Sequence, residues 1–502
     1  MAQHEAVETA FHRILPNGLD VELGCAQHYL TPARPPVQDR KNTLTGVAEA
    51  VESLLNNIYL SKRSVFGIPA KGEIVESSGV PGALANRGKN PLATINEKRA
   101  GRGLRVLIYS HDTLGLGHLR RCRAIAHSLV EHDKDVSVLI LSGSPIIGSF
   151  DFRARVDFVR VPGVIKLRNG EYTSLNLHID IKETLAIRAS IIRHTAAAFA
   201  PDLFLVDKEP LGLRGEVAGT LAMLKSRGVP LILGLRDVMD DPSLLEPEWK
   251  RKNVLPAVRD LYDEIWVYGL PQICDPLAGI ALPKSVRRKI TYTGYLHRTV
   301  CNPNQGYVKN LPDEPYLLVT TGGGGDGDAL IDWTLRAYEA GAELPYPAVF
   351  VLGPFMQPES QTEFLRRAER LKNVHAITFD ANMEALMDRA AGIIAMGGYN
   401  TFCEILSFDK RAIIVPRTTP RLEQSIRAER ASELGLVQML PDDGVRDVGA
   451  MINALRMLPR QKRPSEIVVP GLLDGLPNVN RLMTRHLARP RMRNRFSVAS
   501  GG

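Results

Sequence analysis

The sequence predicts an α/β protein with two Rossmann-like domains that face each other across a cleft. From residue 105 onward, short β-branched runs alternate with longer stretches of helical periodicity, which is typical of a parallel sheet wound with helices. This alternation occurs in two series along the chain. Each series opens with a strand, a glycine-rich loop and a helix, and the two loops lie at residues 110–118 and 321–328. The chain therefore contains two copies of one architecture.

The first series predicts a domain over residues 101–300. A strand at 105–110 leads into a helix at 119–130, because the apolar residues between Cys122 and Leu129 share one helical face. The short apolar runs that follow have the length and composition of buried strands. These further strands are expected at residues 136–141, 203–206, 230–235, 264–268 and 290–293.

The second series predicts a domain over residues 311–470. The segment from 297 to 312 contains Asn-Pro-Asn-Gln-Gly, which has the turn chemistry of a connection between domains. After it the alternation of strands and helices resumes. Strands are expected at residues 316–320, 348–352, 374–379, 392–396 and 412–415.

Both ends of the chain differ from these series. Residues 1–100 are rich in turn-forming residues and poor in periodic apolar segments, so they predict a partly disordered extension in which 44–60 forms one amphipathic helix. Residues 471–502 predict a basic tail. Its segment 481–495 is expected to begin as a helix and to end as a solvated arm.

Composition limits the class of protein. The 502 residues are 44% hydrophobic and 24% charged, as in soluble globular proteins of two or three domains. No apolar run approaches the length of about 18 residues that a membrane-spanning helix needs. The first residues show neither a secretory signal nor a transit peptide. The five cysteines are scattered, with no Cys-x-x-Cys spacing, and predict reduced thiols. We therefore expect a cytoplasmic protein.

The net charge of +8 predicts an anionic partner. Nucleotide diphosphates fit this charge, and so does a peripheral contact with anionic lipid at the inner face of a membrane. Nucleic acid is not expected, because aromatic residues make up only 6% of the chain and are not interleaved with basic ones.

The first candidate site is the loop at residues 111–121, where the first strand passes into the first helix. Ligands of α/β folds bind at this edge of the sheet. Gly115 and Gly117 allow the backbone to approach a ligand closely, and Arg121 follows in the cleft. His118 lies near the helix amino terminus, whose partial positive charge disfavours the imidazolium, so the neutral ring is suited to act as a general base. A helix-capping or hydrogen-bonded structural histidine fits the spacing equally well.

The second candidate site is the loop Thr-Thr-Gly-Gly-Gly-Gly-Asp-Gly-Asp at 320–328. Its four glycines, Gly322, Gly323, Gly324 and Gly325, would expose backbone N–H groups at a helix amino terminus, which is a binding site for phosphate. The loop matches neither a Walker A sequence nor a dinucleotide fingerprint. The alternative is a tight turn without a ligand.

The third candidate site combines residues 395–404 with residues 416–424. Gly397 and Gly398 end a strand, and Asn400 and Thr401 are expected to cap the helix that follows. Glu404 lies one helical turn beyond Asn400 on the same face, where its carboxylate would bind ribose hydroxyls. Gln424 would contact sugar hydroxyls from the neighbouring loop. A solvated glutamate on a helix is the alternative for Glu404.

These residues resemble a known family. The stretch 396–440, with its Gly-Gly turn, helix glutamate, Val-Pro ending and Glu-Gln pair, is similar to the family 28 glycosyltransferase carboxyl-terminal domain of MurG, the lipid-linked N-acetylglucosaminyltransferase of peptidoglycan synthesis. The resemblance implies the GT-B fold and a UDP-sugar donor, with Phe379 near the base, Glu404 on the ribose and Gln424 near ribose or sugar. The glycine loop at Gly322 matches that family in outline, but its glycine-rich loop and its membrane-docking patch are not found in the amino-terminal domain. A lipid-linked muramyl-pentapeptide acceptor is therefore not supported.

The amino-terminal segment Gly-Leu-Gly-His-Leu-Arg-Arg-Cys at 115–122 is similar to the UDP-sugar hydrolase of pseudaminic acid synthesis, in which the histidine activates water. Together with residues 201–207 and 235–240, it also resembles a group of predicted bacterial glycosyltransferases of unassigned substrate.

The expected function is transfer of a sugar from a nucleotide-sugar, most simply a UDP-sugar, to an unidentified acceptor. His118 is the first candidate base and Asp207, at the carboxyl end of a strand, is the second. No metal or other cofactor is expected, because His111 and His118 have no third ligand at a recognisable spacing. Hydrolysis of the same donor and a non-catalytic nucleotide-sugar-binding regulator remain as alternatives.

Overall fold

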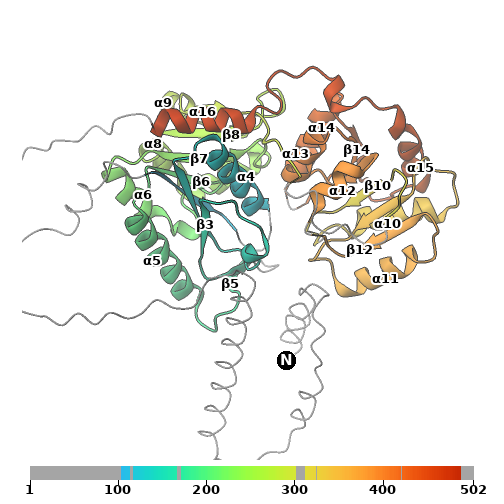
Figure 1. Ribbon diagram of the computed structural model, residues 1–502, viewed down its shortest axis with the longest axis horizontal. Helices are drawn as coiled ribbons and strands as arrows, with labels where there is room; N and C mark the ends of the chain where they lie inside the picture. The colour runs from blue at the N-terminus through green and yellow to red at the C-terminus, as the bar shows by residue number, and fades with distance from the viewer. Residues whose placement is uncertain are drawn as a thin grey trace, which may run out of the picture. The chain divides into compact units, whose positions relative to one another are not determined.

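The computed structural model describes residues 103–112, 117–166, 171–300, 311–323, 325–380, 382–419 and 421–487 (Figure 1). The predicted extension at 1–100 with its helix at 44–60 lies outside the described residues. So do residues 301–310 of the predicted connection and the chain after residue 487.

The first half of the described chain forms one parallel sheet of seven strands in the order β3-β2-β1-β6-β7-β8-β9. Its strands are β1 (Leu104–Ser110), β2 (Val136–Ser142), β3 (Val156–Arg160), β6 (Leu203–Asp207), β7 (Leu231–Arg236), β8 (Glu264–Tyr268) and β9 (Ile290–Tyr292). A separate antiparallel hairpin pairs β4 (Val164–Lys166) with β5 (Tyr172–Ser174). The helices are α4 (Gly117–His132), α5 (Ile181–Phe199), α6 (Ala218–Ser226), α7 (Pro242–Arg251), α8 (Val254–Asp260) and α9 (Lys284–Arg287).

Helices cover both faces of this sheet, which explains its continuous apolar strands. Val106 and Ile108 of β1 belong to the same core cluster as the apolar side of α4. The alternate residues Leu107 and Tyr109 pack in a second cluster with α5, α6 and α8. A parallel sheet that is buried on both faces needs apolar residues at every strand position.

The second half forms a parallel sheet of six strands in the order β12-β11-β10-β13-β14-β15. Its strands are β10 (Leu317–Thr320), β11 (Ala348–Val351), β12 (Val374–Ile377), β13 (Gly392–Ala395), β14 (Arg411–Ile414) and β15 (Gln438–Met439). Helices α12 (Met383–Arg389), α13 (Tyr399–Ser407) and α14 (Glu423–Glu433) pack on one face. Helices α10 (Asp328–Glu339), α11 (Pro358–Ala368) and α15 (Val448–Met457) pack on the other. The predicted α/β class with two Rossmann-like domains is confirmed.

The segment predicted as a basic tail contains helix α16 (Gly475–Leu487). This helix returns to the first half and packs on α4 (Figure 1). Val479, Leu482 and Met483 are buried in the core cluster that contains α4, and Asn480 Nδ2 donates a hydrogen bond of 3.0 Å to Ser128 Oγ. Arg485 also forms an ion pair of 2.5 Å with Glu264 of β8, so the helix is an integral part of the first domain. None of the helices in the described residues is long and apolar enough to cross a membrane.

Candidate active site

The candidate residues lie where each sheet reverses its strand order. In the first sheet β1 lies between β2 and β6, and in the second sheet β10 lies between β11 and β13. At such a point the two neighbouring crossover connections leave in opposite directions and open a crevice at the carboxyl ends of the strands. His118 follows β1 and Asp207 ends β6. The glycine loop follows β10, and Gly397 follows β13.

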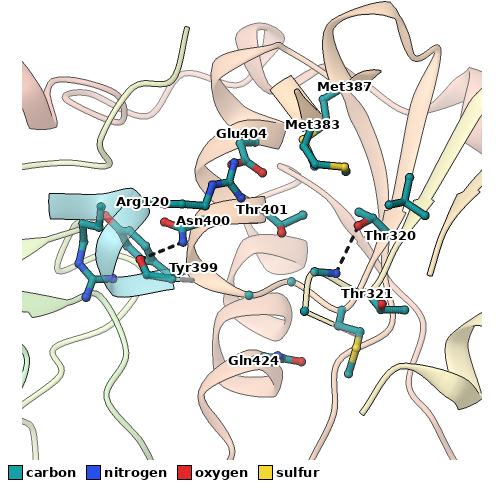
Figure 2. A pocket seen from close by; sticks show the side chains of 18 of the residues that line it. Arg120, Thr320, Thr321, Met383, Met387, Tyr399, Asn400, Thr401, Glu404 and Gln424 are labelled. Atoms are coloured by element: carbon teal, nitrogen blue, oxygen red, sulfur yellow. Dashed lines mark hydrogen bonds and ion pairs between the residues drawn. The ribbon is translucent and has the colours of Figure 1, made fainter. Parts of the chain in front are cut away.

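One cavity of about 360 Å³ connects these two points, and its lining comes from both domains (Figure 2). This volume lies within the range of small-molecule sites. Gly325 does not line the cavity, and Gly115 and Gly324 lie outside the described residues. The sequence-predicted residues in its wall are Gly117, His118, Arg121, Gly322, Gly323, Phe379, Gly397, Gly398, Asn400, Thr401, Glu404 and Gln424.

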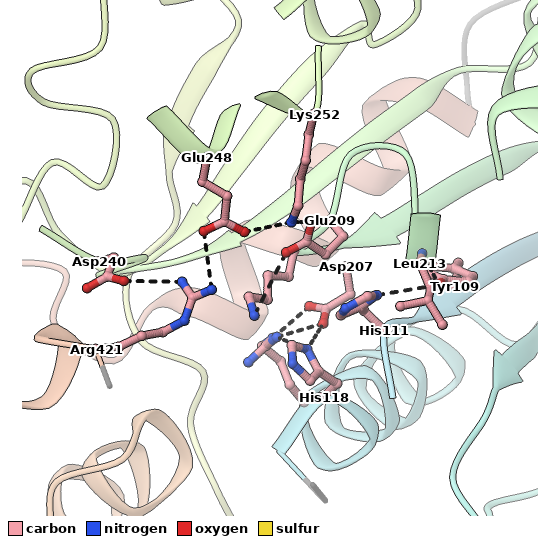
Figure 3. A network of polar contacts seen from close by, with 12 residues as sticks. Tyr109, His111, His118, Asp207, Glu209, Leu213, Asp240, Glu248, Lys252 and Arg421 are labelled. Carbon is pink, nitrogen blue, oxygen red and sulfur yellow. Dashed lines mark hydrogen bonds and ion pairs between the residues drawn. The ribbon is translucent and has the colours of Figure 1, made fainter. Parts of the chain in front are cut away.

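On the amino-terminal side of the cavity, His118 and Arg121 share the carboxylate of Asp207 (Figure 3). The distance from His118 Nδ1 to Asp207 Oδ2 is 2.5 Å. Arg121 donates from Nε to Oδ1 at 2.8 Å and from Nη2 to Oδ2 at 2.7 Å. With Nδ1–H directed at the carboxylate, Nε2 of His118 is the nitrogen with a lone pair available to the cavity.

Burial lowers the pKa of His118 to about 4, against the opposing charge of Asp207. Burial, which the sequence does not reveal, is therefore the largest cause of the neutral ring. For Asp207, burial acts to raise the pKa, but Arg121 and His118 hold it well below its usual range. Asp207 is 1% exposed, and both of its oxygens are engaged. This geometry does not favour Asp207 as a second general base, because its carboxylate is already hydrogen-bonded to His118 and Arg121.

Helix α4 begins at a fixed place because Asp112 accepts a hydrogen bond from the backbone N–H of Leu119 at 3.0 Å. Ser142 Oγ donates to the other oxygen of Asp112 at 2.6 Å, which ties the helix start to β2. A side-chain acceptor of this kind satisfies one of the free N–H groups of a helix amino terminus. The position of His118 in the first turn is thereby set by two strands.

On the carboxyl-terminal side of the cavity, the carboxylate of Glu404 is fully buried. Arg120 of α4 forms an ion pair with Glu404 Oε1 and a second with Glu384 at 2.8 Å (Figure 2). Burial, with the nearby charge of Glu384, raises the pKa of Glu404 to about 7, although Arg120 opposes the shift. The second oxygen, Oε2, has no hydrogen-bond partner among the described residues. The solvated alternative for Glu404 is excluded, and an acceptor atom is free for a ligand hydroxyl.

Asn400 and Thr401 do not cap α13. The residue at the cap is Gly398, and no side chain accepts a capping hydrogen bond there. Asn400 lies inside the first turn, where its Nδ2 donates to the carbonyl oxygen of Gly117 at 3.0 Å and its Oδ1 accepts from Arg298 at 2.9 Å. The prediction failed because the Gly-Gly turn needs no side-chain cap, which leaves Asn400 available for a contact with the amino-terminal domain.

The two glycine turns of the carboxyl-terminal domain are tight. Gly322 and Gly397 both have positive φ, of 71° and 76°. A Cβ on Gly397 would lie 2.7 Å from the side chain of Ile414, so this position excludes a larger residue. Backbone therefore forms the cavity wall beside both strands, as close approach of a ligand requires.

Helix α14, which carries Gln424, is fixed by two carboxylates of the amino-terminal domain. Arg427 donates to both oxygens of Asp237 at 2.7 Å and to the carbonyl oxygen of Gly397 at 2.9 Å. Asp240 accepts from the backbone N–H of Leu422 at 3.0 Å, at the start of the helix. The position of Gln424 in the cavity thus depends on both domains.

The charged residues of the cavity that were not predicted as site residues include Arg120, Arg236, Glu384 and Arg417. Arg236 could have been predicted from the sequence as a site residue, because it ends the buried strand β7 at the same sheet edge as Asp207. The other three depend on pairings between segments that are distant in sequence. In the described residues, no group of three or more His, Cys, Asp or Glu side chains is placed to hold a metal ion.

Comparison with known proteins agrees with this architecture. Residues 329–461 match the model of the glycosyltransferase family 28 C-terminal domain. Comparison with curated protein sequences gives no significant match.

Solved glycosyltransferase structures share the fold. The calicheamicin glycosyltransferase CalG4 has a TM-score of 0.50 and 16% identity, over 77% of this chain and 99% of its own. Medicago truncatula UGT71G1, complexed with UDP-glucose, has a TM-score of 0.52 and 14% identity, over 79% of this chain and 100% of its own. Phytolacca americana UGT2, complexed with UDP-2-fluoro-glucose and pterostilbene, has a TM-score of 0.50 and 15% identity, over 76% of this chain and 95% of its own. The chain therefore has the GT-B fold that these glycosyltransferases share, and its residues 329–461 match the glycosyltransferase family 28 C-terminal domain.

Proposed function

We propose that the protein transfers a sugar from a UDP-linked donor to an acceptor hydroxyl without a metal ion. The observation that carries the proposal is the meeting of two groups in one cavity: a neutral histidine paired with a buried aspartate, and a buried glutamate with a free oxygen. The first is the arrangement of a general base and the second is an acceptor for ribose hydroxyls. The choice of UDP is supported by the nucleotides bound in structures of the same fold.

The donor would lie along the carboxyl-terminal wall of the cavity. Glu404 Oε2 would accept from the ribose, and Phe379, which is 46% exposed, would offer its ring to the base. Gln424 would face ribose or sugar. The diphosphate would lie by the turns at Gly322 and Gly397, where backbone N–H groups and the start of α10 favour negative charge.

In the reaction, Nε2 of His118 would take the proton of the acceptor hydroxyl as its oxygen attacks the anomeric carbon. The bond from that carbon to the diphosphate oxygen breaks, and UDP leaves with the electron pair. Asp207 stabilises the imidazolium that forms, and it holds Nδ1 as the protonated nitrogen. Backbone amides and arginine side chains are the proposed stabilisers of the leaving diphosphate, in the place of a metal ion.

The test is a panel of nucleotide-sugars assayed for UDP release, with and without candidate acceptor alcohols. Release that depends on an acceptor supports transfer. Release in water alone would identify hydrolysis instead, and binding without any release would identify a regulator.

Replacement of Glu404 by alanine is expected to weaken UDP binding by about 1–3 kcal/mol, because a buried hydrogen-bond acceptor for the ribose is lost. Calorimetric titration with UDP and with an analogue that lacks both ribose hydroxyls makes the test specific. The wild-type protein should prefer UDP, and the variant should bind both ligands equally. Glu433→Ala, an exposed change on α14, is the control. Equal affinity of Glu404→Ala and wild type for UDP would remove Glu404 from the site.

Turnover at saturating donor and acceptor is expected to stay level from about pH 8 down to about pH 5, because His118 stays neutral over this range. We follow kcat because it reports the ionisation of groups in the bound complex. The lowered pKa of His118, about 4, means that the neutral base is lost only as the pH falls through that value. The titration of Glu404 near pH 7 should instead appear in donor affinity. A pH–rate profile measures the first effect. A fall in kcat centred near pH 6.5, the pKa of an ordinary histidine, would contradict it.

A further inference from the structure

Arg236 is an arginine of the cavity with an unsatisfied charge. It is the last residue of β7, so the amino-terminal sheet delivers it to the cavity wall. Its Nε is buried and has no hydrogen-bond partner among the described residues. No described carboxylate lies within ion-pair distance of its guanidinium, whereas Asp207 holds Arg121 and Glu423 holds Arg417.

A partly buried cation without a partner is costly, since the hydration it has lost is not replaced. Burial lowers the pKa of Arg236 to about 10, and the charges of Arg427 and Arg121 act in the same direction. Glu423 opposes this shift, but one oxygen of Glu423 is already taken by Arg417 at 2.7 Å. Glu423 is thus in direct contact with Arg417 and not with Arg236, and the guanidinium of Arg236 has no carboxylate in direct contact among the described residues.

The surroundings of Arg236 indicate which part of a ligand would supply the missing anion. Two of its neighbouring charges, Glu423 and Arg427, belong to α14 of the carboxyl-terminal domain, and the other two, Arg121 and Asp237, belong to the amino-terminal domain. Arg427 in turn donates to the carbonyl oxygen of Gly397, in the turn that forms the donor wall. Arg236 thus comes from the acceptor-side domain but faces donor-side elements.

We infer that Arg236 binds the diphosphate of the donor, so that the amino-terminal domain contributes a cation to the leaving group. The inference rests on the proposed function. A guanidinium has paired N–H donors that match phosphate oxygens, and a buried site strengthens such charge-assisted hydrogen bonds. The same contact would stabilise the charge that develops on UDP as the glycosidic bond breaks.

The experiment compares wild type, Arg236→Gln and Arg236→Lys by calorimetric titration with UDP, UMP and uridine. Arg236→Gln is expected to lose about 10- to 100-fold in UDP affinity, the usual loss for a hydrogen bond to a charged group, and to keep its uridine affinity. Arg236→Lys should recover part of the loss. Arg259→Gln, which changes an exposed arginine paired with Asp260, should bind all three ligands as wild type does.

Thermal melting without ligand gives an independent readout. Because Arg236→Gln removes a partly buried charge that no carboxylate contacts directly, its melting temperature should equal or exceed that of wild type, and UDP should raise it less than it raises that of wild type. A structural role for Arg236 would instead lower the ligand-free melting temperature, and that result overturns the inference.

The titrations also separate this inference from the proposed function. A wild-type protein that binds neither UDP nor uridine would refute the proposed function itself. Wild-type UDP affinity in Arg236→Gln, with or without a raised KM for the acceptor, would leave the proposed function intact and overturn the assignment of Arg236 to the diphosphate.

Discussion

Replacing His118 by alanine is expected to reduce turnover by about 10²- to 10⁴-fold, the usual contribution of a general base. UDP affinity should stay close to that of wild type, because the proposed donor contacts are made mainly by the carboxyl-terminal domain. The loss should appear in kcat, since proton transfer occurs only as the acceptor attacks. Turnover, UDP affinity and melting temperature measured on one preparation separate a chemical role from a structural one.

His111, which lies beside His118, provides a matched control for the His118→Ala variant. His111 is also buried at the end of β1, its ring centroid is 5.6 Å from that of His118, and burial lowers its pKa to about 3. It does not line the cavity. His111→Asn should therefore retain turnover per folded molecule. Near wild-type turnover in a stable His118→Ala protein would refute the general-base assignment.

Replacing Asp237 by alanine is expected to lower the free energy of unfolding by about 3–5 kcal/mol, which is typical when one partner of a buried ion pair is removed. The Asp237 and Arg427 side chains are almost fully buried, and Tyr295 also donates to Asp237 at 2.8 Å. The variant leaves the guanidinium of Arg427 without a carboxylate in the interior. Urea denaturation, followed by fluorescence, measures the change.

The double variant Asp237→Leu with Arg427→Met is the informative control. Because apolar replacement of both charges removes their desolvation cost, the double variant should be more stable than Asp237→Ala. It also removes the hydrogen bond from Arg427 to Gly397, so UDP affinity should fall even where stability returns. A double variant no more stable than the single one would show that the ion pair is not the source of the effect.

The fold was largely predictable from sequence because each strand and helix is encoded by the pattern of apolar residues in its own short segment. Each predicted strand is present, with ends within two residues of those expected. The strands β3 and β15 and the hairpin of β4 and β5 were not predicted. Strand β3 is at the sheet edge and mostly half-exposed, and it mixes Asp157 and Arg160 with apolar residues, so it lacks the continuous apolar run of the central strands.

The site was predictable only in part. Parallel strands place their carboxyl ends at one edge, which is why His118 and Asp207 were both recognised as candidates. Their relation in the structure, a buried histidine hydrogen-bonded to an aspartate that also holds Arg121, depends on burial and on this third partner. The pairing of Arg120 with Glu404 joins residues that are 284 positions apart in the sequence, and no local pattern encodes such a contact.

The return of α16 to the first domain bears on how the chain folds during synthesis. Domains usually fold in the order in which they leave the ribosome. Here the apolar side of α4 that packs on Val479, Leu482 and Met483 remains uncovered until residues 475–487 have been translated, after the entire second sheet. The first domain of the nascent chain therefore exposes the apolar face of α4 for most of translation.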